Sequence, residues 1–275
     1  MPGAKWTMRL DPVAPGAVPQ LTDAGARVSG SMLKEDEMRQ GLATLGKRMD
    51  ALQNALYAES KHAVLVVFQA RDGAGKDSTI RRVFGRLDPL GCAVSAFKVP
   101  TPLELSHDFL WRVHHAIPAR GSIGVFNRSH YEDVLVVRVH RLVPEEVWRP
   151  RYEQINQFER LLTQNGVRIL KFFLHISKEE QRERLRERLD DPTKYWKFNP
   201  ADLGEREKWD EYTHAYQDML SRTSTADAPW FVVPADKKLP RDLLVARVVV
   251  EALERLDSRF PGPPAGLEEF RRQLA

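Results

Sequence analysis

The sequence predicts an α/β protein in three layers, with a parallel sheet of five strands between two layers of helices. Short apolar runs alternate with amphipathic segments along the 275 residues, an order typical of strand–helix–strand units. The first run, residues 63–68, is apolar throughout, as expected for a strand buried on both faces. A glycine-rich turn and a helix follow it directly, so a ligand site is expected at the carboxyl edge of the sheet.

Strand and helix signals continue in regular order along the chain. Apolar or β-branched runs predict strands at residues 63–68, 93–99, 121–127, 168–176 and 230–234. Apolar residues at helical spacing predict helices at residues 35–59, from 78 onwards, 103–117, 134–142, 152–164, 202–221 and 239–256, with one more turn in the tail. The long helix at 35–59 is expected to pack on the domain or on a second subunit.

Three segments are expected in the chain. Residues 1–30 are rich in Pro, Gly and Ala, which favours an extended arm. Residues 31–257 hold the folded domain, since no linker interrupts the strand and helix signals there. A cluster of prolines then begins a tail at residues 258–275.

Composition narrows the class of protein. Hydrophobic residues make up 42% and charged residues 29%, which is ordinary for a globular protein, and no apolar run approaches the ~20 residues that span a bilayer. The N-terminus lacks the apolar core of a secretory signal, and the single cysteine, Cys92, suits a reducing cytoplasm. A net charge of +4 without a basic stripe argues against nucleic acid as a partner. We therefore expect a cytoplasmic protein without a membrane segment.

The turn after the first strand has the composition of a phosphate-binding loop. Its residues are Asp72, Gly73, Ala74, Gly75, Lys76, Asp77 and Ser78. The glycines let backbone N–H groups approach a phosphate at a helix N-terminus, and Lys76 reaches the bridging oxygens. Asp72 would repel a phosphate unless a divalent cation lay between them, so the sequence predicts a metal here. A plain glycine turn that ends the strand is the alternative.

A polar cluster follows the third predicted strand. It contains Asn127, Arg128, Glu132 and Asp133. In a phosphate-loop kinase the strand beside the loop ends in a residue that holds or orients the metal, a place taken here by Asn127. Glu132 and Asp133 come about one helical turn later, where they could complete a metal shell or contact the acceptor. The alternative is a cluster that caps the next helix.

The charged stretch at residues 178–205 is interpreted as a helical lid. It carries Arg182, Arg184, Arg186, Arg188, Lys194 and Lys197, with aromatic residues beside the lysines. Arginines in a lid stabilise charge on a phosphoryl group during transfer. Glutamates interleave with the arginines, so a solvated helix held by i,i+4 ion pairs is the alternative.

Five segments of the sequence together resemble the second polyphosphate kinase family. They are QARDGAGKDSTIRRVFG, FKVPTPLELSHDFLWRVH, VFNRSHYEDVLVVRVH, HISKEEQRERLRERLDDPTKYWKFNPADL and APWFVVPADKK. They occur in the family's order between residues 33 and 256, and NRSHYEDV is similar to the subgroup that accepts both nucleoside mono- and diphosphates. The resemblance implies a thymidylate-kinase-like P-loop fold, a requirement for Mg²⁺ or Mn²⁺, and inorganic polyphosphate as phosphoryl donor.

The loop chemistry and the resemblance together predict the site residues. The predicted catalytic residues are Asp72, Lys76, Asn127, Arg128 and Arg188, although many members of the family have aspartate where this chain has Asn127. The predicted metal ligands are Asp72 and Asp133. Phosphate is expected at Gly73, Ala74, Gly75, Lys76, Asp77, Ser78, Arg182, Lys194 and Lys197. The nucleotide is expected at Lys98, Arg112, Glu132 and Asp133.

The resulting hypothesis is a Mg²⁺-dependent transferase that moves the terminal phosphoryl group of polyphosphate onto AMP or ADP, and onto GMP or GDP, reversibly in principle. The resemblance also implies a homo-oligomer, either a dimer or a tetramer. Two other functions remain open. One is a nucleoside monophosphate kinase that uses ATP, and the other is a regulator that binds nucleotide without turnover.

Overall fold

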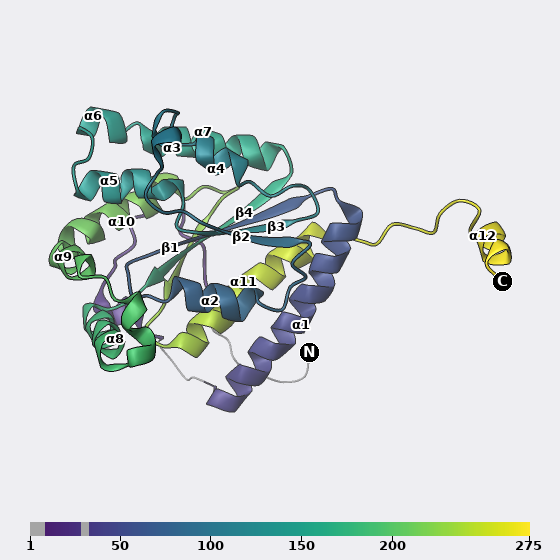
Figure 1. The fold of residues 1–275 in the computed structure, drawn as a ribbon, viewed down its shortest axis with the longest axis horizontal. Helices are drawn as coiled ribbons and strands as arrows, with labels where there is room; N and C mark the ends of the chain where they lie inside the picture. Colours follow the sequence, from purple (N-terminus) through teal and green to yellow (C-terminus); the bar gives the residue numbers. More distant parts are fainter. Residues whose placement is uncertain (1–8, 29–32) are drawn as a thin grey trace.

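Five parallel strands form the central sheet of the computed structural model, which describes residues 9–28 and 33–275 (Figure 1). The strands are β1 (Ala63–Ala70), β2 (Cys92–Ala96), β3 (Ile123–Asn127), β4 (Val167–His175) and β5 (Trp230–Pro234), in the order β2-β3-β1-β4-β5. All eight residues of β1 are buried, as its unbroken apolar run predicts. The predicted parallel sheet of five strands is therefore confirmed.

Two layers of helices enclose the sheet (Figure 1). One layer is α1 (Glu35–Glu59), α2 (Lys76–Phe84) and α11 (Lys238–Leu256), whose apolar residues share one core with alternate residues of β1. The other face of β1 contributes to a second core, which the other layer covers. The principal helices of that layer are α4 (Trp111–His115), α5 (Val136–Val139), α6 (Glu145–Trp148), α7 (Arg151–Gln164) and α10 (Trp209–Thr223).

Helix α1 has the bounds that its apolar spacing predicts. Its residues Met38, Met49 and Leu56 are buried in the core that contains α11. The apolar stripe of this helix is therefore used within the chain, in agreement with the first of the two expected packing partners.

Two predicted helices are replaced by shorter pieces. The helix predicted at 103–117 is α3 (Pro102–Leu105) followed by α4, because the Asp108 carboxylate accepts the N–H of Leu110 and forms a turn between them. The helix predicted at 134–142 is the 3₁₀ turn η2 (His130–Val134) followed by α5. Arg141 then adopts a left-handed conformation, with φ of 53°, which ends the helical run.

The helix predicted at 202–221 is also divided. The structure has α9 (Ala201–Glu207) and α10. Lys208 between them has a non-helical backbone conformation, so the two helices are not continuous. The break lets the Trp209 ring lie 3.9 Å from the guanidinium carbon of Arg71, beside the phosphate loop. A tertiary contact therefore overrides the local helical pattern here.

The described part of the N-terminal segment follows the outer edge of the sheet. The Val13 N–H donates to Trp230 O over 2.8 Å, and the segment ends in the 3₁₀ turn η1 (Asp23–Ala26) near the end of β5. An edge strand covered in this way has fewer open backbone groups. Residues 1–8 and 29–32 of the expected arm lie outside the described residues.

The C-terminal segment ends in α12 (Leu267–Gln273), which lies apart from the sheet and its two layers (Figure 1). This is the extra helical turn expected after the prolines. Of the helices in the described ranges, none combines the length and the hydropathy needed to cross a bilayer.

Candidate phosphate-binding site

The loop between β1 and α2 has the backbone of a phosphate cradle. Gly73 and Gly75 adopt positive φ angles of 84° and 97°, a region that residues with a Cβ rarely enter. Gly75 is the N-cap of α2, so the loop runs directly into a helix N-terminus. This geometry can hold an anion by backbone N–H groups and the helix dipole.

Lys76 lies buried at the start of α2. Its Nζ donates to Ala70 O over 3.0 Å and lies 3.8 Å from Asp72 Oδ1. Burial lowers the pKa of Lys76, Arg128 lowers it further, and the carboxylate of Asp72 opposes both. Burial and Arg128 therefore outweigh the nearby carboxylates, so the positive charge of Lys76 is only partly compensated. A bound anion would complete the compensation.

Asp72 and Arg128 form the contact that joins the two predicted clusters. Arg128 Nη2 donates to Asp72 Oδ1 over 2.5 Å, and its Nη1 donates to Glu132 over 3.3 Å. Burial alone would raise the pKa of Asp72, but Lys76 and Arg128 outweigh burial and keep that pKa below its usual value. The Asp72 carboxylate is therefore ionised at neutral pH.

The parallel register explains why these clusters meet. Phe68 of β1 lies beside Asn127 of β3, so the residues that follow each strand leave the sheet at the same edge. Arg128 has a φ of 62° while its N–H donates to Phe68 O over 3.1 Å. A left-handed arginine is strained, and strain of this kind is concentrated at functional sites.

Carboxylate groups gather around the Lys76 ammonium. Asp72, Glu132 and Asp77 all act on its charge, and Asp77 Oδ1 accepts a hydrogen bond from Asn127 Nδ2 over 2.5 Å. Oxygen ligands of this kind fit Mg²⁺. Within residues 9–28 and 33–275, no three His, Cys, Asp or Glu side chains are grouped as a metal cage. A cation here would therefore take its remaining ligands from water or from substrate phosphates.

Asp133, the second predicted metal ligand, lies beside Arg151 of α7. Its Oδ1 accepts from Arg151 Nη1 over 2.8 Å, and the charges that act on it include Arg112 and Glu132. Burial raises the pKa of Asp133, while Arg151 opposes the shift. Successive residues of a 3₁₀ turn point about 120° apart. Glu132 therefore faces the loop and Asp133 faces α7.

The other predicted nucleotide residues lie beyond the end of β2. Arg112 Nη1 donates to Lys98 O over 2.9 Å and lies 3.8 Å from Glu104. Its guanidinium carbon is 5.4 Å from the centre of the Phe97 ring. The Arg112 charge also acts on Asp133, so the structure brings these two predicted nucleotide residues close together.

The predicted lid is built of α8 (Lys178–Asp190), the 3₁₀ helix η3 (Pro192–Lys197) and α9. Arg188 of α8 donates to Asp202 over 2.9 Å and to Lys197 O over 3.1 Å. Its charge also acts on Asp72. Arg188 is therefore held within the predicted lid, where its charge reaches Asp72 of the loop.

Arg182, a predicted phosphate contact, lies on the solvent side of α8 in this structure. Its guanidinium pairs with Glu179 and Glu183 and is 52% exposed. Residues two apart on an α-helix point about 200° apart, whereas residues four apart share a face. Because Arg184 and Arg188 face the loop, Arg182 faces solvent.

Lys194 and Lys197 lie on η3, beyond the end of α8. Lys194 Nζ lies 3.0 Å from Asp191, and Lys197 Nζ lies 5.0 Å from the centre of the Trp196 ring. Both side chains engage their own segment. No contact joins either of them to the phosphate loop in the described part of the chain.

Several residues of the site have no signal in the sequence that distinguishes them from ordinary core or surface residues. Gln181 Nε2 donates to Asp72 O over 2.8 Å, and Arg71 Nη2 donates to Thr213 over 2.6 Å. Arg184 and Arg241 bind the backbone of the loop. Arg184 is the exception, because it is one of the predicted lid arginines and is spaced four residues from Arg188.

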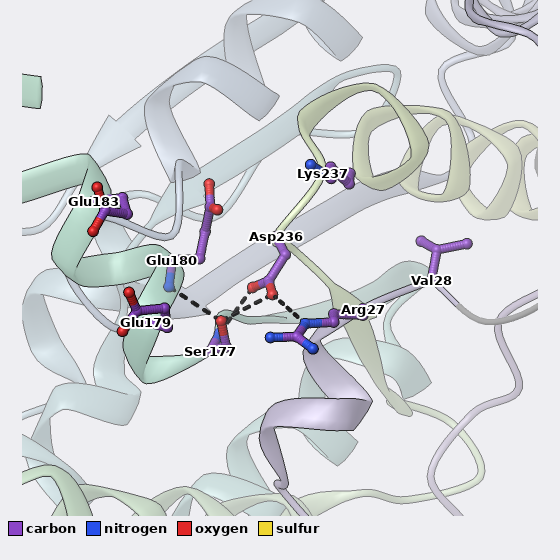
Figure 2. A pocket seen from close by; sticks show the side chains of 8 residues that line it. All are labelled: Arg27, Val28, Ser177, Glu179, Glu180, Glu183, Asp236 and Lys237. Atoms are coloured by element: carbon purple, nitrogen blue, oxygen red, sulfur yellow. Dashed lines mark hydrogen bonds and ion pairs between the residues drawn. The ribbon is translucent and has the colours of Figure 1, made fainter.

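A separate pocket lies at the N-terminal end of α8, beside the N-terminal segment and the segment that follows β5 (Figure 2). It is lined by Arg27, Val28, Ser177, Glu179, Glu180, Glu183, Asp236 and Lys237. Four of these side chains are acidic and two are basic, so the lining would repel a polyanion. The phosphate loop is therefore the better candidate site.

Comparisons with known proteins show which family the chain is similar to. Residues 32–261 match the family model described as polyphosphate kinase 2. The chain is 54% identical over 231 residues to the AMP/ADP-polyphosphate phosphotransferase of Meiothermus ruber, which covers 84% of this chain and 86% of that protein. It is 50% identical over 249 residues to the ADP-polyphosphate phosphotransferase of Rhodopseudomonas palustris, covering 85% and 86%.

A third relative and a solved structure extend the comparison. The chain is 36% identical over 199 residues to the GDP-polyphosphate phosphotransferase of Pseudomonas aeruginosa, covering 72% of this chain and 56% of that protein. Its fold is similar to the crystal structure of polyphosphate kinase 2 from Arthrobacter aurescens TC1, with a TM-score of 0.84 and 39% identity. That superposition covers 94% of this chain and 99% of the crystallised one.

Proposed function

Because the chain belongs to the polyphosphate kinase 2 family, as its motifs predict, we propose that it transfers the terminal phosphoryl group of inorganic polyphosphate to AMP and ADP. The observation that carries this proposal is its close relation, along most of both chains, to phosphotransferases that are named for these substrates. One relative is named for GDP, so guanine nucleotides are included among the proposed acceptors.

The chemistry of the loop supports a polyanionic donor. A carboxylate inside a phosphate cradle is tolerated when a cation lies between acid and phosphate. Asp72 is kept ionised by Lys76 and Arg128. We propose that Asp72, with Asp77 and Glu132 nearby, holds Mg²⁺ together with substrate phosphates. When bound, the cation would neutralise charge on the transferred group.

The side chains of the site suggest how the transfer is assisted. Donor and acceptor phosphates would meet in line at the loop, without a covalent intermediate on the protein. Lys76 would hold the transferred phosphoryl group, with the N–H groups of the loop around it. Arg128 and Arg188 would stabilise the charge that develops on its oxygens.

The acceptor is proposed to lie between the end of β2 and η2, where Lys98, Arg112, Glu132 and Asp133 are found. Asn127 would orient the site through Asp77. Lys194 and Lys197 would contact polyphosphate after a movement of η3 toward the loop. Residues 178–205 would act as the lid of a domain at 31–257, with residues 1–30 as an arm and 258–275 as a tail.

The decisive experiment is a transfer assay without ATP. Polyphosphate is supplied with AMP, ADP, GMP or GDP, with Mg²⁺ or with EDTA, and the products are separated by anion-exchange chromatography. We expect ADP and ATP from the adenine acceptors, and no product with EDTA. If product forms only when ATP replaces polyphosphate, the protein is a nucleoside monophosphate kinase instead. Tight nucleotide binding without turnover on either donor would indicate a regulator.

Assembly and location complete the proposal. A homo-oligomer, dimer or tetramer, is proposed with a contact surface other than the apolar stripe of α1, because that stripe is buried within the chain. Light scattering coupled to size-exclusion chromatography measures the mass of the assembly. A cytoplasmic location is proposed because polyphosphate, Mg²⁺ and nucleotides would be required together.

A further inference from the structure

Arg184 belongs to the lid helix α8 and binds backbone carbonyl groups of the phosphate loop. Its guanidinium donates to Gly73 O over 3.0 Å and to Ala74 O over 3.1 Å. On its other side it donates to Ala235 O and Asp236 O, both over 2.8 Å. The residue is 7% exposed. One buried cation therefore joins the phosphate loop, α8 and the segment after β5.

Arg241 of α11 also binds the phosphate loop. It is fully buried, and its guanidinium donates to Ala74 O over 2.9 Å and to Ser78 Oγ over 3.1 Å. A Cβ on Gly75 would lie 2.2 Å from its Nη1, so a glycine is required for this approach. Two guanidinium groups thus meet at the carbonyl of Ala74.

These contacts determine which way one peptide plane faces. In a trans peptide the carbonyl of one residue and the N–H of the next point in opposite directions. The described chain contains no cis peptide bond. With Ala74 O held by both arginines, the N–H of Gly75 points to the opposite side, as a cradle for phosphate requires.

The charges of the two arginines are largely compensated, so their role is mainly geometric. Arg184 Nε donates to Glu180 over 2.9 Å, and Arg241 is paired with Asp242 over 2.7 Å. Asp242 also accepts from Thr79 and Arg82 of α2. Neither cation is therefore left to attract a distant phosphate on its own.

The base of α8 is held from the opposite side as well. Figure 2 shows the Asp236 carboxylate facing Ser177, the N-cap of α8, and Arg27 of the N-terminal segment. Asp236 accepts from both the N–H and the hydroxyl of Ser177 over 2.9 Å. Because this end of α8 is held in place, Arg184 has a rigid support from which to hold the loop.

We propose that Arg184 and Arg241 are positioning residues that clamp the carbonyl of Ala74 and so hold the phosphate loop in its ligand-binding conformation. This inference rests on the proposed function, because it assigns the clamp to the binding of the polyphosphate donor. The residues touch the backbone of the loop and no substrate. Their loss is expected to weaken the grip on phosphate without changing the acceptor site.

The test compares two methionine variants, Arg184→Met and Arg241→Met, with two lysine variants, Arg184→Lys and Arg241→Lys. The control is Arg255→Met, which changes an exposed arginine on α11. Isothermal titration with polyphosphate and Mg²⁺, without nucleotide, measures binding, and steady-state assays separate kcat from the KM of AMP. We expect polyphosphate affinity to fall at least tenfold and kcat at least tenfold in the methionine variants. The KM of AMP should stay within about twofold, and the control should match the wild type.

The lysine variants keep the buried charge but cannot make all the contacts of the guanidinium groups: Arg184 donates to carbonyls on two sides, and Arg241 donates to Ala74 O and to Ser78 Oγ. We therefore expect them to fold and still to lose at least tenfold in polyphosphate affinity, and they carry the test if the methionine variants do not fold. Wild-type affinity and kcat in the lysine variants would overturn the clamp. A uniform loss of active protein with unchanged affinity would also overturn it, since that result indicates only a structural role.

A parallel titration with ATP separates this inference from the proposed function. If the wild type binds ATP at the loop but not polyphosphate, the proposed donor is wrong, and the same comparison of variants then tests the clamp with ATP. If the wild type binds polyphosphate and every variant binds it equally well, the donor stands and the clamp is refuted.

Discussion

At the scale of single residues, the site depends on the balance of charge around Lys76. The ammonium group is buried, Arg128 lies close enough to lower its pKa, and the compensating carboxylate of Asp72 is 3.8 Å away. Asp72 is in turn shared with Arg128. A buried cation that is only partly compensated costs stability, and it is retained where an anion is bound.

Replacing Lys76 should therefore separate activity from stability. We expect Lys76→Met to lower kcat by about 10²–10³, the usual effect of losing one group that stabilises transition-state charge. The melting temperature should stay the same or rise, because the variant removes a buried charge next to Arg128. Transfer assays and thermal unfolding of the same preparation measure both effects.

The exposed Lys47 of α1 provides the control. Lys47→Met should leave both activity and melting temperature unchanged. A Lys76→Met protein with near wild-type turnover would show that the loop is not the site of transfer.

At the scale of elements, the β1–α2 unit depends on a glycine whose conformation and surroundings are both restrictive. Gly75 has φ of 97°, and an added Cβ would lie 2.2 Å from Arg241. A left-handed residue with a Cβ costs roughly 1–3 kcal/mol before any clash is counted. Replacing Gly75 by alanine, which adds one methyl group, therefore tests the conformation of this turn.

We expect Gly75→Ala to lower the free energy of unfolding by at least ~1–3 kcal/mol and to abolish most activity, since Arg241 must move. The matched control is Gly204→Ala in α9, where an added Cβ meets nothing within 4 Å. That change should stabilise the protein by about 0.5–1 kcal/mol through helix propensity. Urea unfolding gives both values, and a stable, active Gly75→Ala protein would contradict the described loop.

The β4–α7 pair contains a buried ion pair beneath η2. Lys171 Nζ donates to Glu159 over 2.5 Å, to Tyr131 over 2.8 Å and to Thr223 O over 2.7 Å, and both charged side chains are at most 2% exposed. Tyr131 lies three residues after Arg128. This network therefore supports the segment that carries the arginine of the site.

Removing one partner of this pair should be far more harmful than removing both. Lys171→Met leaves the Glu159 carboxylate buried without its cation, which typically costs about 3–5 kcal/mol. In the double variant Lys171→Met, Glu159→Leu the two changes should cost much less than their sum. A double-mutant cycle of urea unfolding measures the coupling, and additive effects would show that the two side chains do not interact.

At the scale of the whole molecule, the N-terminal segment is joined to the end of β4 through a histidine. His175 Nε2 lies 2.8 Å from Thr22 O, and its Nδ1 is buried without a hydrogen-bond partner in the described structure. Burial lowers the pKa of His175. Thr22 and the charges of Asp236 and Asp23 oppose the shift, whereas Arg71 adds to it.

This arrangement makes the protein less stable in mild acid. Below the ordinary pKa of about 6.5 the unfolded chain binds a proton at this position, whereas the folded chain does so only at lower pH. The contribution of neutral His175 to the free energy of unfolding is therefore complete above pH 6.5, the pKa in the unfolded chain. It is lost as the pH falls toward the lowered pKa of the folded chain. We expect His175→Gln, whose amide Nε2 takes the place of the imidazole Nε2 and can still donate to Thr22 O, to lose this pH dependence.

Melting temperatures at pH 7.5 and 5.5 test the prediction. The drop between the two pH values should be smaller in His175→Gln than in the wild type. His115→Gln, a change at an exposed histidine, should behave as the wild type does. Equal drops in all three proteins would exclude a role for the buried ring.

The order of strands along the chain, the phosphate loop and the family could all be predicted from short stretches of sequence. An unbroken apolar run predicts β1 because a strand buried on both faces has no polar side. The helices at 103–117, 134–142 and 202–221 were wrong in extent, because turns at Asp108, Arg141 and Lys208 depend on contacts that a local pattern does not contain. The spacing of apolar residues predicts the extent of a helix only where local interactions, and not tertiary contacts, determine the backbone conformation.

The sequence by itself determined which residues form the loop, and it predicts phosphate chemistry for the acid, lysine and glycines of that loop, since these features follow from neighbours in the chain. Only the tertiary structure decided which charges are available to a ligand. It turned Asp133 toward Arg151 and Arg182 toward solvent, and it brought Arg241 to Ala74 across 167 residues. Partners of this kind are chosen by packing and by the cost of burying an unpaired charge, and both depend on the whole fold.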